Sequence, residues 1–172
     1  MHVANVKFYD IANGEGVRTS LFVSGCRHHC KNCFNAEAWD FTFGTPYTKK
    51  TEEEIIASLA PDYIAGLTVL GGEPFEPENQ AEVLSLVTAV KSRYPHKTVW
   101  VYSGFTYEEL LSDSRAATDT ARALLQQIDV LVDGRFIESK INIRLKFRGS
   151  ENQRIIDVKQ SLESGKTVVF NF

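Results

Sequence analysis

The sequence predicts an α/β fold with a mostly parallel sheet and outer helices, built as a single domain over residues 1–172. Short apolar segments rich in β-branched residues alternate along the chain with segments of helical periodicity, which is typical of strands connected by helices. The apolar segments end at glycines or polar turns. A chain of 172 residues is long enough to bury one real core.

The first half of the chain predicts two strands and two helices. Thr19–Ser24 is a β-rich apolar run that ends at a glycine, and Leu67–Leu70 is a buried strand closed by two glycines. Thr51, with a glutamate three residues later, is a capping-box pair that predicts a helix starting there. A second helix is expected from about Pro77. Its apolar residues recur at helical spacing: Val83, Leu84, Val87 and Val90.

The second half predicts further strands and two short helices. Thr98–Tyr102 and Val130–Val132 are apolar strand segments. Thr106 and Glu109 form another capping pair, and the segment TDTARALLQQI has helical character. Late strands are expected in RIIDV and in TVVFNF, which ends the sequence.

Four conspicuous segments each follow a predicted strand. They are the cysteine loop after Ser24, GGEPF (Gly71–Phe75), SGF (Ser103–Phe105) and DGRF (Asp133–Phe136). Ligands of parallel α/β sheets bind beyond the carboxyl ends of the strands. We therefore expect these segments to meet in one site.

The three cysteines of the chain, Cys26, Cys30 and Cys33, stand together as C-x3-C-x2-C. A thioredoxin-like dithiol would use only the last two. A zinc site could recruit His28 or His29 as its fourth ligand, but no second ligand pair exists for a structural site. A cubane iron–sulfur cluster, normally held by four thiolates, would keep one iron open for chemistry. The spacing favours the cluster, and the two histidines are then expected to be exposed loop residues.

Composition argues against several functional classes. The net charge is −3 without a basic surplus, so nucleic-acid binding is not indicated; the nearest basic segment is Arg144–Arg154. No apolar run approaches the roughly 20 residues of a membrane span, and no secretory signal is visible at the N-terminus. An odd number of cysteines without export signals predicts a reducing compartment, with the cytoplasm as the default.

These segments carry a family resemblance that extends from about Phe8 to about Val158. The cysteine motif followed by Phe34 resembles the signature of the radical S-adenosylmethionine enzymes, and GGEPF resembles their second motif. More narrowly, DIANGEGVRTSLFVSGCRHHCKNCFN, VYSGF, DVLVDGRF and RGSENQRIIDV resemble the activating enzymes of anaerobic ribonucleotide reductases.

The resemblance implies an incomplete (βα) barrel of the radical SAM type that carries one [4Fe-4S] cluster. Cys26, Cys30 and Cys33 would ligate three irons, and the methionine amino and carboxylate groups of S-adenosyl-L-methionine would chelate the fourth. One electron would cleave the C–S bond, giving methionine and a 5′-deoxyadenosyl radical. That radical would take a hydrogen atom from one glycine of the large subunit of anaerobic ribonucleoside-triphosphate reductase. Reduced flavodoxin is the implied electron donor.

The resemblance also assigns the cofactor contacts. Asn32, Cys33 and Phe34 inherit contact with the adenine, whereas Gly71, Gly72 and Glu73 inherit contact with the methionine amino group; Tyr102, Ser103 and Gly104 would line the ribose or carboxylate side. Glycines let a backbone approach a ligand closely, and a carboxylate suits an ammonium group.

Alternatives remain open at this stage. The partner could be another glycyl-radical enzyme such as pyruvate formate-lyase, the substrate could be a small molecule, or the chain could be a zinc-binding adaptor. Phe34 could be a core residue. Arg18 could serve the site or pair on the barrel floor, and Asp129 and Asp133 could order a docking loop or cap a turn. The segment Arg148–Gln153 could contact the partner, or form a turn closed by its own Ser and Asn side chains.

Overall fold

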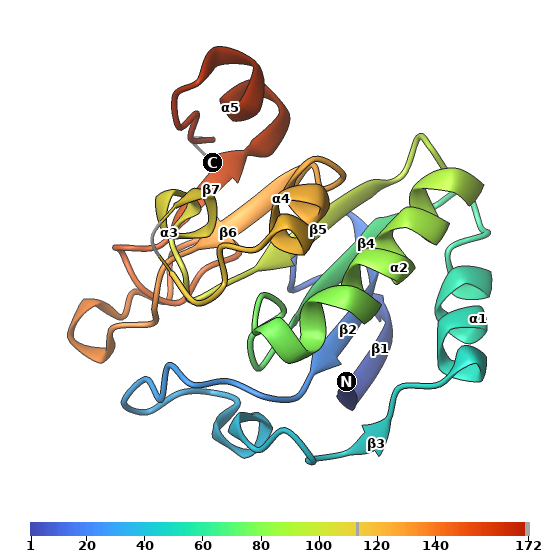
Figure 1. The fold of residues 1–172 in the computed structure, drawn as a ribbon, viewed down its shortest axis with the longest axis horizontal. Coiled ribbons are helices and arrows are strands. Elements are labelled where there is room, and N and C mark those ends of the chain that lie inside the picture. Colours follow the sequence, from blue (N-terminus) through green and yellow to red (C-terminus); the bar gives the residue numbers. More distant parts are fainter. Residues whose placement is uncertain (113, 171–172) are drawn as a thin grey trace.

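The computed structural model describes residues 1–112 and 114–170 and contains a single mixed sheet (Figure 1). Seven strands are hydrogen-bonded in the order β3-β1-β2-β4-β5-β6-β7. Their bounds are β1 (His2–Asp10), β2 (Val17–Val23), β3 (Thr45–Pro46), β4 (Ile64–Gly71), β5 (Thr98–Tyr102), β6 (Val130–Asp133) and β7 (Arg154–Asp157).

The centre of the sheet is parallel and its edges are antiparallel. Strands β2, β4, β5 and β6 pair in parallel, which confirms the predicted α/β class. On one side β1 runs antiparallel to β2 and β3, and on the other β7 runs antiparallel to β6. The sequence does not predict β1, because Val3 is the one buried residue of this strand and the segment has no apolar run.

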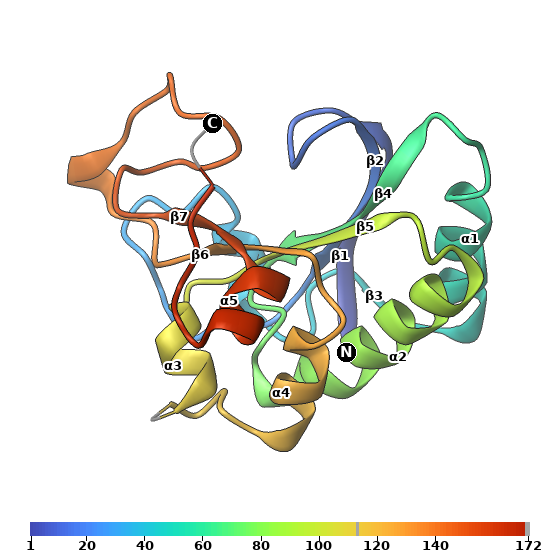
Figure 2. The same ribbon diagram turned by 90° about the horizontal axis from the view of Figure 1, so that it is seen from above.

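Within the described residues, the α-helices cover one face of the sheet (Figure 2). They are α1 (Lys49–Ser58), α2 (Pro77–Arg93), α3 (Tyr107–Leu111), α4 (Asp119–Leu125) and α5 (Val158–Ser164), with short 3-10 helices at Ala36–Trp39 and Glu138–Lys140. The opposite face is covered by loops (Figure 2), among them those before β2 and after β6.

The helix starts follow local capping chemistry. The prediction that α1 begins at Thr51 is wrong by one turn, because the side chain of Thr48 accepts a hydrogen bond from the backbone N of Thr51 and the helix starts at Lys49. The predicted capping box of α3 is confirmed, with the side chains of Thr106 and Glu109 each bonding the other's backbone N–H.

The end of the chain differs from the prediction. RIIDV forms β7, but the aspartate that ends β7 then caps α5 by accepting from the backbone N of Gln160. In TVVFNF the described part makes one isolated bridge, between Ile156 and Val169, instead of a strand; residues 171–172 lie outside the described residues.

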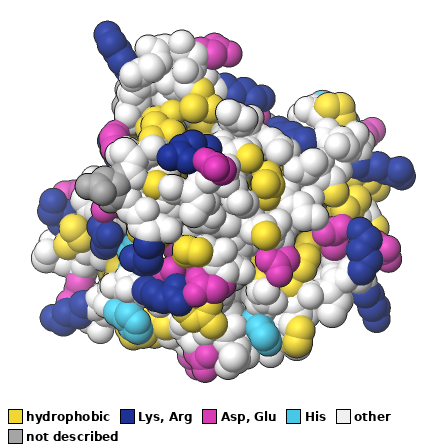
Figure 3. Space-filling view, in the orientation of Figure 1, with side chains coloured by type: hydrophobic (Ala, Val, Ile, Leu, Met, Phe, Trp, Pro, Cys, Tyr) yellow, Lys and Arg dark blue, Asp and Glu magenta, His cyan; other side chains and the backbone are white. Residues whose placement is uncertain are grey.

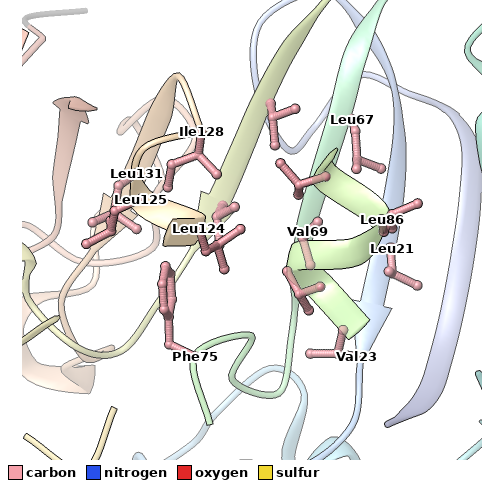
Figure 4. Close-up of a cluster of buried hydrophobic side chains, with 14 of the residues drawn as sticks. Leu21, Val23, Leu67, Val69, Phe75, Leu86, Leu124, Leu125, Ile128 and Leu131 are labelled. Carbon is pink, nitrogen blue, oxygen red and sulfur yellow. The ribbon is translucent and has the colours of Figure 1, made fainter. Parts of the chain in front are cut away.

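The main core lies between the sheet and the helices (Figure 4). Side chains that alternate along the strands meet those of α2 and α4. Fully buried examples are Leu21, Leu67, Val69, Leu86 and Leu124. Each such side chain contributes roughly 1.5–3 kcal/mol by burial. On the other face a smaller cluster of Trp100, Val130, Val132 and Ile155 closes the sheet.

The surface mixes charges of both signs. On the face shown in Figure 3, Lys and Arg side chains lie beside Asp and Glu side chains. Ion pairs such as Lys49–Glu52 and Arg154–Glu108 belong to this pattern. In the part of the chain that the structure describes, no helix is both long and apolar enough to cross a membrane.

Candidate functional site

A cavity of about 550 Å³ opens at the carboxyl ends of the parallel strands. This volume suits a small-molecule or cofactor site. All four segments singled out in the sequence contribute to its wall, which confirms that they converge. The contributing residues include Cys26, Cys30 and Cys33 after β2, Gly71 and Gly72 at the end of β4, Ser103 and Gly104 after β5, and Gly134 and Phe136 after β6.

The three thiols share this wall with different degrees of burial. Cys26 is buried, with 7% of its surface exposed, and Cys30 and Cys33 are half-buried. Burial raises the pKa of Cys26 to about 12. Burial, together with the neighbouring Cys33, also raises the pKa of Cys30. Metal binding at these thiols must therefore displace protons, since the thiolate is the ligand.

The donor arrangement does not resemble a site for one metal ion. Within residues 1–112 and 114–170, no three His, Cys, Asp or Glu side chains converge closely enough to hold an ion. A zinc ion needs its ligands on a single centre, whereas a cubane cluster spreads its thiolates over several irons. Three thiols on one cavity wall provide the donors that a cubane cluster with one open iron needs.

His28 is buried, so the prediction that it is an exposed loop residue is wrong. Its side chain is 4% exposed, and Nε2 lies 2.9 Å from Oε2 of Glu73. Nε of Arg135 donates to Nδ1 across 3.2 Å. Both ring nitrogens are therefore occupied and His28 offers no fourth metal ligand. His29 is exposed as predicted, with its ring edge-on to Trp39 at a centroid distance of 4.6 Å.

The carboxylate of Glu73 faces into the protein. It is completely buried and is absent from the described cavity wall. Besides His28, it accepts hydrogen bonds from the backbone N of Gly104 (2.7 Å) and the hydroxyl of Ser103 (2.9 Å). The backbone N of Phe75 donates a further one at 2.9 Å. These four bonds match the acceptor capacity of a carboxylate, and Glu73 links the ends of β2, β4 and β5.

The turn at Gly71–Gly72 lies against the cysteine loop. The backbone N of Gly72 donates to the carbonyl of Val23 at 2.7 Å, and that of Glu73 donates to the carbonyl of Gly25 at 2.8 Å. A Cβ atom on Gly72 would lie 2.7 Å from the carbonyl oxygen of Gly25. Only glycine permits this approach, which brings the backbone of the turn to the cavity.

Comparison with known proteins agrees with this geometry. Residues 12–156 match the family model described as a 4Fe-4S single cluster domain. An anaerobic ribonucleoside-triphosphate reductase-activating protein of Vibrio cholerae is 45% identical over 148 residues, covering 85% of this chain and 91% of that protein. The chain belongs to this family of activating proteins. Proteins of the same name from Pasteurella multocida and Enterobacteria phage T4 are 44% and 36% identical, covering 87% and 85% of this chain and 94% and 87% of theirs.

Phe34 and Asn32, two of the predicted adenine contacts, lie in different surroundings. Phe34 is 76% exposed, lines the cavity and packs against Phe136 at a centroid distance of 5.4 Å, so the alternative that it is a core residue is wrong. Asn32 adopts a left-handed backbone conformation with φ of 54° and donates to Glu138. It does not belong to the described cavity wall.

A second part of the cavity wall comes from residues that the sequence does not mark as site residues. Lys7, Asn13, Phe147 and Arg148 come from β1, from the loop before β2 and from the segment before β7. The described wall includes two cationic side chains, Lys7 and Arg148, and no Asp or Glu. RGSENQ was expected to be a partner contact or a turn, and its first residue, Arg148, lies in the cavity wall instead.

Arg18 lies outside this wall, at the start of β2. It is completely buried, and its guanidinium donates to the hydroxyls of Thr68 and Thr98 and to the carbonyls of Glu15, Leu67 and Thr98. Burial lowers its pKa to about 10. These contacts favour a structural role for Arg18 over a role in the site, because its hydrogen bonds join β2 to β4 and β5.

The remaining candidates make structural contacts. Asp133 accepts from the backbone N of Tyr107 at 2.7 Å, which caps α3, and Asp129 accepts from the backbone N of Val99 at 2.7 Å. In RGSENQ the hydroxyl of Ser150 accepts from the backbone N of Ile137 and Asn152 donates to the carbonyl of Arg135. The bond of Asp133 favours the capping interpretation. The bonds of Ser150 and Asn152 tie RGSENQ to the segment after β6 and do not close a turn within it.

Proposed function

We propose that this chain activates anaerobic ribonucleoside-triphosphate reductase by generating a glycyl radical on it. The observation that carries the proposal is the cavity at the strand ends, where Cys26, Cys30 and Cys33 line one wall with the Gly71–Gly72 turn. In this proposal the three thiolates hold a [4Fe-4S] cluster and S-adenosylmethionine binds beside it. The match to a 4Fe-4S domain and the names of the relatives support the assignment.

The cofactors supply the difficult chemistry, and the chain supplies orientation. Held by Cys26, Cys30 and Cys33, the cluster would supply the one electron needed for reductive cleavage of S-adenosylmethionine and so for hydrogen abstraction from the glycine. The Gly71–Gly72 backbone would contact the methionine end, since the carboxylate of Glu73 is already saturated by the protein. Phe34 offers an exposed ring for the adenine, in the company of Asn32 and Cys33. Ser103 lies on the wall for the ribose or carboxylate side.

The sheet agrees with the incomplete βα barrel that this chemistry uses in related enzymes. We infer that β2, β4, β5 and β6 form the parallel part of such a barrel, with the helices outside. The face without helices would then be the inner face, and the cavity lies against it. The partner's glycine would enter there, and a reduced flavodoxin or similar protein of the cytoplasm would supply the electron.

Anaerobic reconstitution with iron and sulfide tests the proposal. We expect about four irons per chain, an electron paramagnetic resonance spectrum that shifts on adding S-adenosylmethionine, and a glycyl radical when the reductase is present. Cys26→Ala, Cys30→Ala and Cys33→Ala should each abolish S-adenosylmethionine cleavage in a folded protein, while His29→Ala serves as the control. A colourless protein that holds only zinc would overturn the proposal. A radical formed on pyruvate formate-lyase instead of the reductase would overturn the choice of partner.

A further inference from the structure

One side chain, His28, joins the four cavity loops that follow β2, β4, β5 and β6. It lies midway between Cys26 and Cys30, in the loop after β2. Its Nε2 bonds to Glu73, which follows β4, and its ring packs edge-on against Phe105, which follows β5, at a centroid distance of 4.5 Å. Its Nδ1 accepts from Arg135, which follows β6. The four loops therefore meet at a single imidazole.

The hydrogen bonds define how this imidazole is used. An arginine can only donate, so Nδ1 must be the acceptor in the contact with Arg135. The ring proton then lies on Nε2 and points to Oε2 of Glu73 across 2.9 Å. A donor and an acceptor on opposite sides fix the ring orientation, in the way that partners of metal-bound groups fix theirs.

The packing around the ring is equally close. A Cβ on Gly104 would lie 2.4 Å from Cδ2 and 2.6 Å from Nε2 of His28. The ring thus rests directly on a backbone segment that Glu73 also holds, through the N–H of Gly104 at 2.7 Å. The cysteine loop can shift from this place only if the imidazole leaves its pocket.

We propose that His28 is a positioning residue, which holds the cysteine loop against the ends of β4, β5 and β6 so that the three thiols face one cavity. Glu73 and Arg135 are its two partners, the first buried and the second reaching the surface with 46% of its side chain exposed. The effect of His28 on catalysis rests on the proposed function. Its structural part concerns the metal-free chain alone.

Alkylation of the metal-free protein tests the structural part. Cys26 is the buried thiol of a chain with three cysteines, so its reaction with iodoacetamide can be followed by mass spectrometry. In His28→Ala we expect the rate at Cys26 to rise at least about tenfold, as for the loss of a hydrogen bond to a charged group. His29→Ala, in the neighbouring exposed residue, should leave the rate unchanged.

Two conservative variants separate the partners. His28→Gln keeps a donor near the position of Nε2, and His28→Asn keeps an acceptor near Nδ1. Because the bond to buried Glu73 is the one that spans the loops, His28→Gln should restore slow alkylation more fully than His28→Asn does. Arg135→Ala should raise the rate by about threefold, whereas Arg122→Ala, which alters an equally exposed arginine on α4, should not.

The reconstituted protein supplies a second readout. His28→Ala should keep its iron but lower the rate of S-adenosylmethionine cleavage by roughly tenfold to a hundredfold, with an altered electron paramagnetic resonance spectrum, and His28→Gln should recover most of both. Wild-type alkylation rates in both His28→Ala and Arg135→Ala would overturn the inference. Loss of iron in every His28 variant, including His28→Gln, would overturn it too, by making the histidine a ligand. Failure of wild-type cleavage would refute the proposed function and leave the alkylation result standing.

Discussion

Arg27 binds both oxygens of the buried carboxylate of Glu76. Its backbone N donates to Oε1 at 2.9 Å, and its Nη1 donates to Oε2 at 2.8 Å. Glu76 is completely buried just before α2, and Arg27 directly follows the first cysteine. Arg115 completes the arrangement by donating to both oxygens from the other side. The cysteine loop is thereby attached to the start of α2.

Glu76→Gln should destabilise the metal-free protein by about 3 kcal/mol, because it leaves two guanidinium groups without their buried counter-charge. Urea unfolding measures the effect. Glu78→Gln is the matched control, since Glu78 also binds Arg27 but has 48% of its side chain exposed. That variant should lose less than about 1 kcal/mol. Equal losses in the two variants would contradict a special role for the buried carboxylate.

The same carboxylate predicts a pH dependence of stability. Burial alone would raise the pKa of Glu76, but hydrogen bonds from Arg115 and Arg27 outweigh it and hold the pKa below its ordinary value of 4.5. A group whose pKa is lowered by folding stabilises the fold above its unfolded pKa and loses that contribution as the pH falls through the folded value. The wild type should therefore lose stability below about pH 4.5, and Glu76→Gln should lose less over the same range. Parallel curves of unfolding free energy against pH would contradict this.

Gly72→Ala should disturb the cysteine loop. The added Cβ would meet two backbone oxygens, those of Gly25 at 2.7 Å and Ala38 at 2.8 Å, and neither can rotate away as a side chain would. We expect a loss of about 1–3 kcal/mol and weaker binding of S-adenosylmethionine, measured by thermal unfolding and calorimetric titration. Gly165→Ala controls for backbone conformation alone, since its Cβ meets nothing within 4 Å. Its cofactor affinity should equal that of the wild type.

Tyr102→Phe should leave stability unchanged or raise it by up to about 1 kcal/mol. The hydroxyl is buried, and the described residues provide it with no hydrogen-bond partner. A buried hydroxyl that has lost its hydrogen bonds to water and gained none in the protein costs free energy, and its removal relieves that cost. Tyr47→Phe is the opposite case, because the Tyr47 hydroxyl donates to Glu52 at 3.2 Å, and it should lose about 1 kcal/mol. A destabilised Tyr102→Phe would reveal a partner for the hydroxyl.

Phe34→Ala should separate cofactor binding from folding. With 76% of its surface exposed, the residue contributes little to the core, so unfolding free energy should change by less than about 0.5 kcal/mol. Loss of an aromatic contact with the adenine should raise the Kd of S-adenosylmethionine by roughly tenfold. Ile143→Ala, at a position that is 96% exposed, is the control. Unchanged affinity in Phe34→Ala would remove the adenine contact from the proposal.

Local patterns accounted for the parallel strands and for the convergence of their loops. The apolar runs at Leu67–Leu70 and Thr98–Tyr102 end at polar or glycine-rich turns, and parallel pairing brings those turns to one edge. The start of α1 was misplaced because Thr48 and Thr51 are both good caps, three residues apart. Local pattern cannot choose between them.

Non-local contacts explain most of what the sequence could not reveal. The burial of His28 depends on Glu73, which is 45 residues away, and on Arg135, which is 107 residues away. The inward orientation of Glu73 depends on the backbone of Gly104 and the hydroxyl of Ser103. Residue types and spacing indicate that such groups share a site. Residue types and spacing do not indicate which of these groups form hydrogen bonds with one another.

The α-helices that the structure describes lie on one face of the sheet, and loops cover the other face (Figure 2). Among the described residues, the main core and the cavity wall therefore share no member. The main core would survive exchange of the segment between the 3-10 helix at Glu138–Lys140 and β7, which contributes none of its residues to that core. A chimera carrying this segment from another activating protein would alter part of the cavity wall, including Phe147 and Arg148, and leave the main core unchanged. Loops on the face without helices can therefore be replaced without changing the residues of the main core.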